Sequence, residues 1–203
     1  MTNEVQGNGD YATATLNAKA AGVENLASGG RYHFTCLDKD GNYKWEEEFD
    51  NQVVQVGKIL MMNTTLYTAS GYTLVGPFLG LIGSATTYSP TDTMASHAGW
   101  TEYTNYTVGA SAVRGTATFA TATGNNVTTS GSNIVTSSAS AITYTVTGAG
   151  GTITGCFLVT GSGAVNTQSS TAGTLWSAGG FAVAKAVTAG DTVAVTYSTT
   201  ATS

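Results

Sequence analysis

The chain has 203 residues and a formal net charge of −5, and only 9% of its side chains are charged. An ordinary soluble domain carries roughly 25% charged residues, so glycine, threonine, serine and alanine fill much of this surface. The few lysines and arginines exclude a nucleic-acid partner, because phosphate binding requires clustered basic side chains. The sequence has no apolar run near the roughly 18 residues of a membrane span and no signal peptide, which predicts cytoplasmic synthesis and no membrane partner.

A strand-rich surface with so few charges is an aggregation hazard in a free monomer. After position 103 the only charged side chains are Arg114, Lys185 and Asp191. The composition therefore favours a permanent oligomer or assembly, and a merely threonine-rich soluble sandwich is the alternative. Cys36 and Cys156 each lie in an apolar strand pattern, which predicts buried free thiols rather than a disulfide.

Residues 1–28 carry isolated large side chains among small and polar residues, without a sustained helical or strand period. Alone, this segment cannot bury enough apolar surface to offset the entropy lost on ordering. It is therefore either disordered or an extended arm that folds against a neighbouring subunit, and its spaced apolar anchors favour the arm. The expected contacts of the arm are Val5, Tyr11, Leu16, Val23 and Leu26.

Alternating apolar residues predict a hairpin with strands at Arg31–Leu37 and Tyr43–Glu47. The sequence Asp38-Lys39-Asp40-Gly41 joins the two strands and ends in the Asp-Gly pair that is typical of hairpin turns. This turn is similar to the opening of a calcium loop. However, Phe49 occupies the position where such a loop needs a closing bidentate glutamate, so a plain hairpin turn is favoured.

From Phe49 onward the apolar residues change to helical spacing, which predicts a helix that begins near this residue. Asp50 or Asn51 is the expected N-cap. The hairpin and helix together, at about residues 31–66, are expected to cover a β-rich body that spans residues 29–203. The apolar positions of the predicted helix are Phe49, Val53, Val56 and Leu60, with Ile59 and Met62 beside them.

The remainder of the chain is expected to form short strands with glycine-rich turns, which is typical of an all-β, mainly antiparallel fold. We therefore expect a β-sandwich or jelly-roll body with an extended N-terminal arm and one short α-helix. Thr121–Ala139 and Gly161–Gly173 are expected to be surface loops, Gly148–Gly151 a hairpin turn, and the residues after Thr91 or Asp92 one short helical turn. The predicted strands are Phe78–Ile82, Trp100–Tyr106, Ala112–Ala120, Ala141–Thr147, Thr152–Thr160, Thr174–Ala178 and Thr192–Ser198.

No catalytic or metal-binding motif stands out in the sequence. Glu46–Glu48 supply carboxylates, but consecutive residues on a strand point in different directions, which argues against an acid–base pair. Asp92, Ser96 and His97 are the residue types of a catalytic triad, yet residues so close in sequence rarely reach its geometry, so His97 is expected to be a hydrogen-bonded loop or core residue. His33 is expected to be exposed. The sequence thus predicts no enzymatic activity, no cofactor and no metal site.

Trp100, Tyr103 and Tyr106 lie close together in sequence and contain the aromatic rings from which a sugar-binding platform could be built. Aromatic residues on strands are more often core residues or subunit-interface anchors. We therefore expect these three side chains to be core residues or contacts with another subunit.

Several sequence blocks follow one another in order between Phe34 and Tyr197. They are FTCLDKDGNYKWEEEFDNQVVQVGK, GPFLGLIG, DTMASHAGWTE, ATFATA, GGTITGCFLVT, GTLWSAGGF and AGDTVAVTY. This ordered series resembles a widespread group of structural proteins from the virions of tailed bacteriophages. Residues 1–28 lie outside the blocks, so an arm there is specific to this chain.

The resemblance implies a non-enzymatic virion protein, and a capsid decoration (cement) protein is the expected role. Its expected partners are the major capsid protein and further copies of this chain, as a dimer or trimer, on the exterior of a capsid assembled in a bacterial host. The alternative is a tail, neck or fibre-associated structural or adhesion protein. A long repetitive shaft would favour that alternative, and the sequence contains none.

Overall fold

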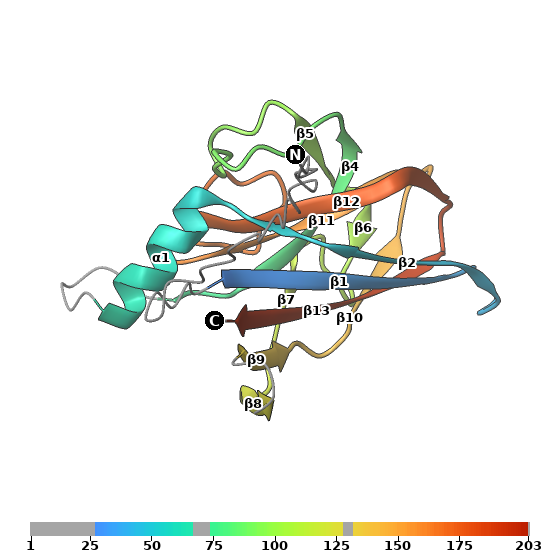
Figure 1. Cartoon of the computed structure of the whole chain (residues 1–203). Coiled ribbons are helices and arrows are strands. Elements are labelled where there is room, and N and C mark those ends of the chain that lie inside the picture. Colours follow the sequence, from blue (N-terminus) through green and yellow to red (C-terminus); the bar gives the residue numbers. More distant parts are fainter. Residues whose placement is uncertain (1–26, 67–73, 128–131, 203) are drawn as a thin grey trace, which may run out of the picture.

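The computed structural model describes residues 27–66, 74–127 and 132–202, which form a sandwich of two β-sheets with one short helix (Figure 1). One sheet has seven strands and the other has six, and all the strand pairs in them are antiparallel. The mainly antiparallel sandwich expected from the sequence is therefore confirmed. The predicted arm contacts lie outside the described residues; they are Val5, Tyr11, Leu16, Val23 and Leu26.

The seven-stranded sheet is built around its two longest strands, the first and the last of the described chain. These two strands pair along their full length: Ala27 lies opposite Thr202 at one end, and Leu37 lies opposite Thr192 at the other. Two shorter strands, β10 (Ile142–Val146) and β9 (Ser132–Ser138), pair with the edge of β13 (Thr192–Thr202) that β1 leaves free. The sheet contains β1 (Ala27–Leu37), β2 (Tyr43–Asp50), β6 (Tyr106–Thr107), β8 (Thr123–Val127), β9 (Ser132–Ser138), β10 (Ile142–Val146) and β13 (Thr192–Thr202).

The six-stranded sheet packs against the first sheet and has two long strands at its centre. These strands are β11 and β12. Gly151 lies opposite Val187 at one end of the pair, and Thr160 lies opposite Thr174 at the other. One edge of β4 is shared by β5 and β7. The sheet contains β3 (Gln52–Val53), β4 (Phe78–Ala85), β5 (Trp100–Tyr103), β7 (Gly115–Thr116), β11 (Gly151–Thr160) and β12 (Thr174–Val187).

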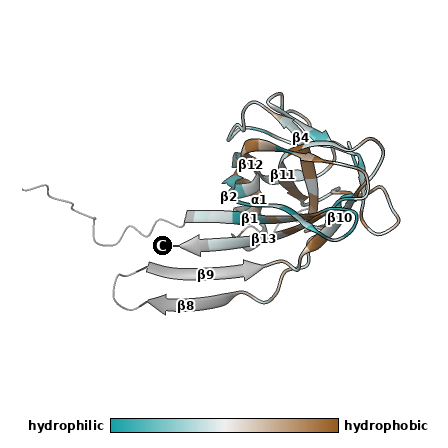
Figure 2. Ribbon diagram, turned by 90° about the vertical axis from the view of Figure 1, so that its right-hand side faces the viewer, coloured by the Kyte–Doolittle hydropathy of each residue, from teal (hydrophilic) through white to brown (hydrophobic). Residues whose placement is uncertain are grey.

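The core lies between the two sheets, where Figure 2 shows hydrophobic residues on the strands of the body. Alternate side chains of β1 point into it, as the sequence pattern predicts. The ring of Tyr32 stacks on Tyr197 with centroids 4.5 Å apart, and its hydroxyl hydrogen-bonds to the Ser177 hydroxyl at 2.8 Å. This bond joins the sheets at a buried position. The predicted free thiols, Cys36 and Cys156, are both buried in the same core.

The helix α1 (Gln55–Leu66) begins later than the sequence pattern predicts. Phe49 belongs to β2, where it lies opposite Tyr32, and Val53 belongs to β3. The expectation that Asp50 or Asn51 caps the helix was wrong, because the chain first completes two strand pairings. Phe49 and Val53 satisfy both a strand period and a helical one, so their spacing alone could not decide between the two.

Two of the predicted turns and loops also differ from the structure. Thr121–Ala139 is not a simple loop, because it contains the antiparallel pair β8–β9. Gly148 and Gly150 do have positive φ angles, but the Gly148–Gly151 segment joins β10 in one sheet to β11 in the other and so is not a hairpin turn. By contrast, Gly161–Gly173 contains no strand or helix, as predicted.

Two predicted strands are shorter than the sequence pattern indicates. Trp100–Tyr106 is divided into β5 and β6 because the chain crosses between the sheets at this point. Within Ala112–Ala120 only β7 is a strand, and Val113 forms an isolated bridge with Thr167 in a loop. The residues after Thr91 form turns and a Thr93–Ser96 bridge instead of the predicted helical turn.

Candidate interaction surface

The inner face of α1 lies close against β12. A Cβ atom added at Gly57 would lie 2.4 Å from the carbonyl oxygen of Trp176, which is too close for any side chain. Leu60, one turn further along, is buried beside Gly161 at the end of β11. Glycine at position 57 therefore lets the helix backbone approach the sheet.

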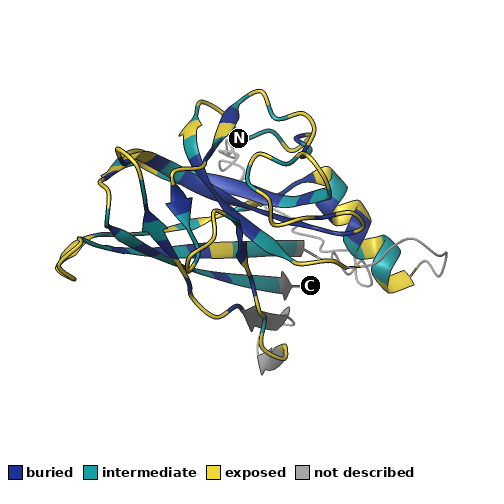
Figure 3. Cartoon of the chain, turned by 180° about the vertical axis from the view of Figure 1, so that it is seen from behind, coloured by how far each residue is buried: buried dark blue, intermediate teal, exposed yellow. Residues whose placement is uncertain are grey.

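The side of α1 that faces away from the sheet is exposed (Figure 3); Gln55, Lys58 and Thr65 are its exposed polar residues, and Ile59, Met62 and Leu66 are its exposed large apolar ones. Ile59 is 50% exposed, Met62 47% and Leu66 70%, and their spacing puts them along one side of the helix. Lys58 is the only charged residue in α1. A surface helix normally turns a polar face to water, so three large exposed apolar side chains along one side of α1 are unusual.

Two more exposed apolar residues, Leu74 and Val75, lie by the end of β11, where the helix residue Leu60 also packs. The Thr160 hydroxyl donates to the Val75 carbonyl at 3.0 Å, and Thr160 directly precedes the glycine that packs against Leu60. Five of the eight large exposed hydrophobic residues in the described chain are thus concentrated in one region. We call this region the α1 surface, and it consists of Ile59, Met62, Leu66, Leu74 and Val75.

A mostly apolar cavity of about 260 Å³ opens beside the α1 surface, with Leu74 in its wall. It lies at the end of the sandwich between the two sheets, where Trp176 and Leu158 face Tyr197 and Phe119. Apolar cavities at protein surfaces accept apolar side chains of a partner. The α1 surface and this cavity together form the candidate interaction surface.

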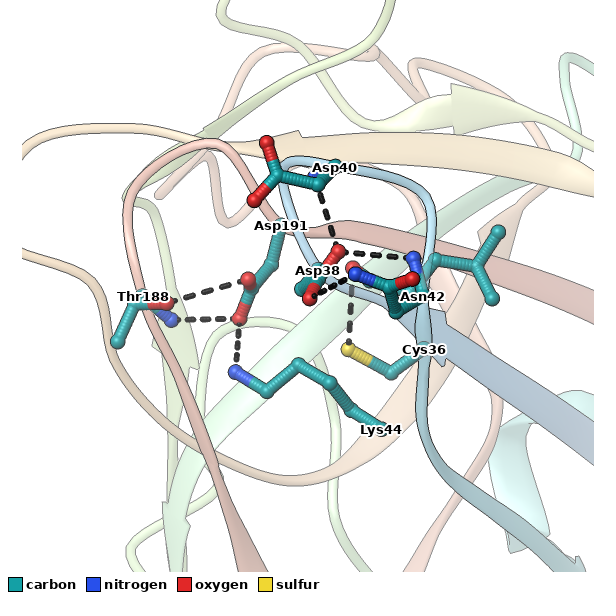
Figure 4. Close-up of polar contacts among 8 residues, drawn as sticks. Cys36, Asp38, Asp40, Asn42, Lys44, Thr188 and Asp191 are labelled. Carbon is teal, nitrogen blue, oxygen red and sulfur yellow. Dashed lines mark hydrogen bonds and ion pairs between the residues drawn. The ribbon is translucent and has the colours of Figure 1, made fainter.

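The Asp38–Asn42 segment is a plain hairpin turn, as the sequence analysis favoured (Figure 4). The Asp38 carboxylate accepts the Asp40 and Asn42 backbone N–H groups at 2.9 and 2.8 Å, and also the Asn42 side-chain amide at 3.0 Å. The hydrogen bonds from Asn42 hold the pKa of Asp38 below its usual range. The carboxylate is therefore used to shape the turn.

Beside this turn lies an ion pair between the buried Asp191 and the more exposed Lys44, which the sequence did not predict (Figure 4). The Lys44 ammonium donates to Asp191 at 2.5 Å, and the N–H and hydroxyl of Thr188 donate to the same carboxylate at 2.8 and 3.1 Å. Burial opposes ionisation of Asp191. The Lys44 and Thr188 hydrogen bonds outweigh that effect and hold the pKa of Asp191 below its usual range.

The three consecutive glutamates separate onto the two faces of β2. Glu46 pairs with the partly exposed His33 at 2.5 Å and Glu48 pairs with Arg31 at 2.6 Å, whereas Glu47 contacts Lys185. No two of these carboxylates form a paired acid–base site. The contacts instead link β2 to β1 and to β12.

The residue types of a triad do not form one in the structure. Asp92 accepts hydrogen bonds from Trp100 Nε1 at 3.0 Å and from the Ser89 N–H at 3.1 Å. His97 Nδ1 lies 3.0 Å from the Trp100 carbonyl oxygen, and its ring stacks on the Trp100 ring with centroids 3.7 Å apart. His97 is therefore a hydrogen-bonded loop residue, as predicted.

Trp100, Tyr103 and Tyr106 are all buried in the core of the chain itself. Trp100 packs between His97 and Phe157, and Tyr106 meets the ring of Tyr144 edge-on at 4.9 Å. The sequence predicts that these residues are either core residues or subunit contacts, and in the structure they are core residues. They offer no exposed ring face to a sugar or a partner.

The sequence analysis also missed the pairing of Arg114 with Glu102. Arg114 Nε and Nη2 donate to the two carboxylate oxygens at 2.9 and 2.7 Å, and the arginine is fully buried. The missed signal was the scarcity of charge in the second half of the chain. Each of the three charged residues after position 103 forms an ion pair with a residue before that position: Arg114 with Glu102, Lys185 with Glu47, and Asp191 with Lys44.

Within the described residues, no three His, Cys, Asp or Glu side chains lie close enough together to bind a metal ion. No helix in the described part of the chain is long and apolar enough to span a membrane. Comparisons of the chain with protein-family models, with curated proteins and with solved structures found no match.

Proposed function

We propose that the chain is a non-enzymatic structural protein of a tailed-bacteriophage virion, and specifically a decoration protein that binds the outer surface of the capsid. The observation that carries the proposal is the α1 surface, which exposes five large apolar side chains, one of which lines a neighbouring apolar cavity. Exposed apolar patches of this kind mark protein–protein contacts. The ordered sequence blocks that resemble tailed-phage virion proteins supply the proposed partner, the major capsid protein.

A decoration protein stabilises a shell by mass action, because it binds the assembled state in preference to free subunits. Contact with two neighbouring capsid subunits buries additional area across their boundary and resists their separation. In the proposed mechanism the α1 surface docks on one capsid subunit. Residues 1–26, which precede β1, reach a neighbouring subunit, and copies of the chain associate with each other.

The expected contribution of the α1 surface to the free energy of binding follows from the exposure of its helix side chains. Fully burying a large aliphatic side chain contributes about 1.5–3 kcal/mol. Ile59, Met62 and Leu66 are 47–70% exposed, so their burial in a complex contributes about 3 kcal/mol together. That amount corresponds to roughly a hundredfold in affinity.

The test is a triple variant, Ile59→Gln, Met62→Gln and Leu66→Gln, which keeps good helix-forming residues on α1. Its binding to purified capsids that lack the chain is measured by co-sedimentation, with folding checked by circular dichroism. We expect roughly a hundredfold weaker binding. A double variant, Tyr43→Gln and Val183→Gln, is the control, because it removes exposed apolar side chains outside the α1 surface. Equal binding by the folded triple variant and the wild type would refute the role of this surface.

The role of the N-terminal segment is tested by deletion. The boundary predicted from sequence, at residue 28, cuts into β1, which pairs with β13 from Ala27 onward. The deletion should therefore remove residues 2–26 and leave this pairing intact. We expect the shortened chain to keep the melting temperature of the wild type and to bind capsids weakly. Unchanged occupancy of the capsid would contradict the proposed arm.

A further inference from the structure

A second cavity, of about 300 Å³, lies away from the α1 surface and has walls of mixed polarity, in which Met94 and Trp100 supply apolar surface. Arg114 and Glu102 line it, together with His97 and the hydroxyl residues Thr101, Ser169 and Thr171. The ring of Phe157 lies behind the arginine, with its centroid 5.0 Å from the guanidinium carbon. The cavity therefore combines a buried ion pair with several hydroxyl groups.

The arginine in this wall has hydrogen-bonding capacity that the chain does not use. Its Nε and Nη2 bind Glu102, and Nη2 also donates to the Ser170 carbonyl at 2.8 Å. Nη1 is buried and has no hydrogen-bond partner among the described residues. Unpaired donors on a buried cation are costly and rare, and an acceptor from a bound molecule is one way to satisfy them.

The backbone beside the cavity is held in an unfavourable conformation. Ser169 has a φ angle of 60°, and it is the only non-glycine residue in the described chain with a positive φ. In this conformation its N–H donates to Glu102 Oε2 at 2.8 Å. Such conformations cluster at ligand sites, where the surrounding structure holds them in place. Here the strained turn fixes the carboxylate that in turn orients Arg114.

His97 adds an acceptor and a flat surface. The Trp100 carbonyl can only accept a hydrogen bond, so His97 Nδ1 carries the proton in their 3.0 Å contact. In the neutral ring Nε2 is then an acceptor. One face of the imidazole is covered by Trp100, so only its other face and its edge are left for the cavity. The wall thus provides donors, acceptors and a small flat surface.

The charges and the volume limit the class of ligand. Among the described residues, Arg114 and Glu102 are the only charged ones in the cavity wall, and they neutralise each other. An anion would face the carboxylate and a cation would face the guanidinium, so an uncharged polar molecule fits best. A volume of about 300 Å³ is at the lower limit for ligand pockets, which suits one ring and excludes a longer chain. We propose that this cavity binds a single uncharged sugar ring or a polyol of similar size.

The proposal is tested by ligand-observed and amide-shift NMR with glucose, galactose, N-acetylglucosamine and the anion glucuronate, each at millimolar concentration. We expect saturable binding of at least one of the three neutral sugars, weaker binding of glucuronate, and shifts of the amides of residues 97–102 and 169–171. The absence of saturable binding for all three neutral sugars would overturn the proposal. Shifts confined to other parts of the protein, or tighter binding of glucuronate, would also overturn it.

A filled-cavity variant provides an independent check. Thr171 is exposed in a loop, and Thr171→Phe places a ring where the sugar would bind. Thr143→Phe is the matched control, on an exposed position of β10 in the other sheet. We expect Thr171→Phe to weaken sugar binding roughly tenfold or more and Thr143→Phe to leave it unchanged. Equal loss in both variants, or no loss in a folded Thr171→Phe protein, would contradict binding in this cavity. Capsid binding is a separate measurement, so this site can fail without affecting the proposed decoration role.

Discussion

The substitution Gly57→Ala tests how closely α1 lies against the sheet. In an exposed helix this change would stabilise the protein by about 1 kcal/mol, because alanine favours helix more than glycine does. Here the added methyl group would lie 2.4 Å from the Trp176 carbonyl oxygen and 2.9 Å from its Cα atom. Both obstacles are backbone atoms of β12, which pairs with β11 and β3 and cannot move freely.

To reach ordinary contact distance the helix must move by about 1 Å, since van der Waals contacts begin near 3.4 Å. Overpacking of this kind costs about 1–3 kcal/mol, and the movement also loosens the packing of Leu60. Subtraction of the helix-propensity gain of about 1 kcal/mol leaves about 0–2 kcal/mol, and the loosened packing of Leu60 adds to this, so we expect a net loss of about 1–2 kcal/mol. For a chain of this length that loss lowers Tm by roughly 3–6 °C.

Thermal unfolding followed by circular dichroism measures this effect. Lys58→Ala is the matched control, because Lys58 is the next helix residue and is exposed. We expect the control to change Tm by less than about 1 °C, as surface substitutions usually do. A Gly57→Ala protein as stable as the wild type, or more stable, would refute the close helix–sheet contact and the orientation of the α1 surface that depends on it.

Two further predictions concern buried ionisable groups. The pKa of Asp191 is lower in the folded chain than in the unfolded one, so its charge stabilises the fold above about pH 4 and this contribution is lost as the pH falls further. Asp191→Asn should cost about 2 kcal/mol at pH 7 and reduce the loss of stability in acid; chemical denaturation at pH 7 and pH 3 measures both, and an unchanged acid dependence would count against the Lys44 ion pair. Burial raises the pKa of Cys36 to about 11 and raises that of Cys156 well above its usual value. Both thiols should resist a thiol reagent at pH 8 in the native protein and react after denaturation; rapid labelling of the native chain would show that the core opens readily.

The sequence predicts the β-sandwich because alternating apolar residues are unambiguous in its longest strands. Tyr32, Phe34 and Cys36 on β1 and Val193, Val195 and Tyr197 on β13 all point into the core. These are the strands that pair along their full length, and each buries one face. Such a pattern can be read locally, since the period of a half-buried strand is fixed by geometry.

Other features depend on contacts that a local pattern does not contain. The β8–β9 pair lies in a threonine- and serine-rich stretch without apolar alternation, and it adjoins the sheet only because the long strand β13 extends past β10. The ion pair of Arg114 with Glu102 joins positions whose proximity follows from the crossing of the chain between the sheets. The sequence analysis did not identify the α1 surface, because it grouped Ile59 and Met62 with the core-facing positions of the predicted helix.

The proposed role of the chain in a virion is tested most directly by its copy number. Quantitative mass spectrometry of purified virions gives the ratio of this chain to the major capsid protein. A decoration protein requires a ratio near one, or a simple fraction of it, which amounts to hundreds of copies per particle. A few to a few dozen copies would instead place the chain in the tail or neck, and its absence from the particles would contradict a structural role in the virion.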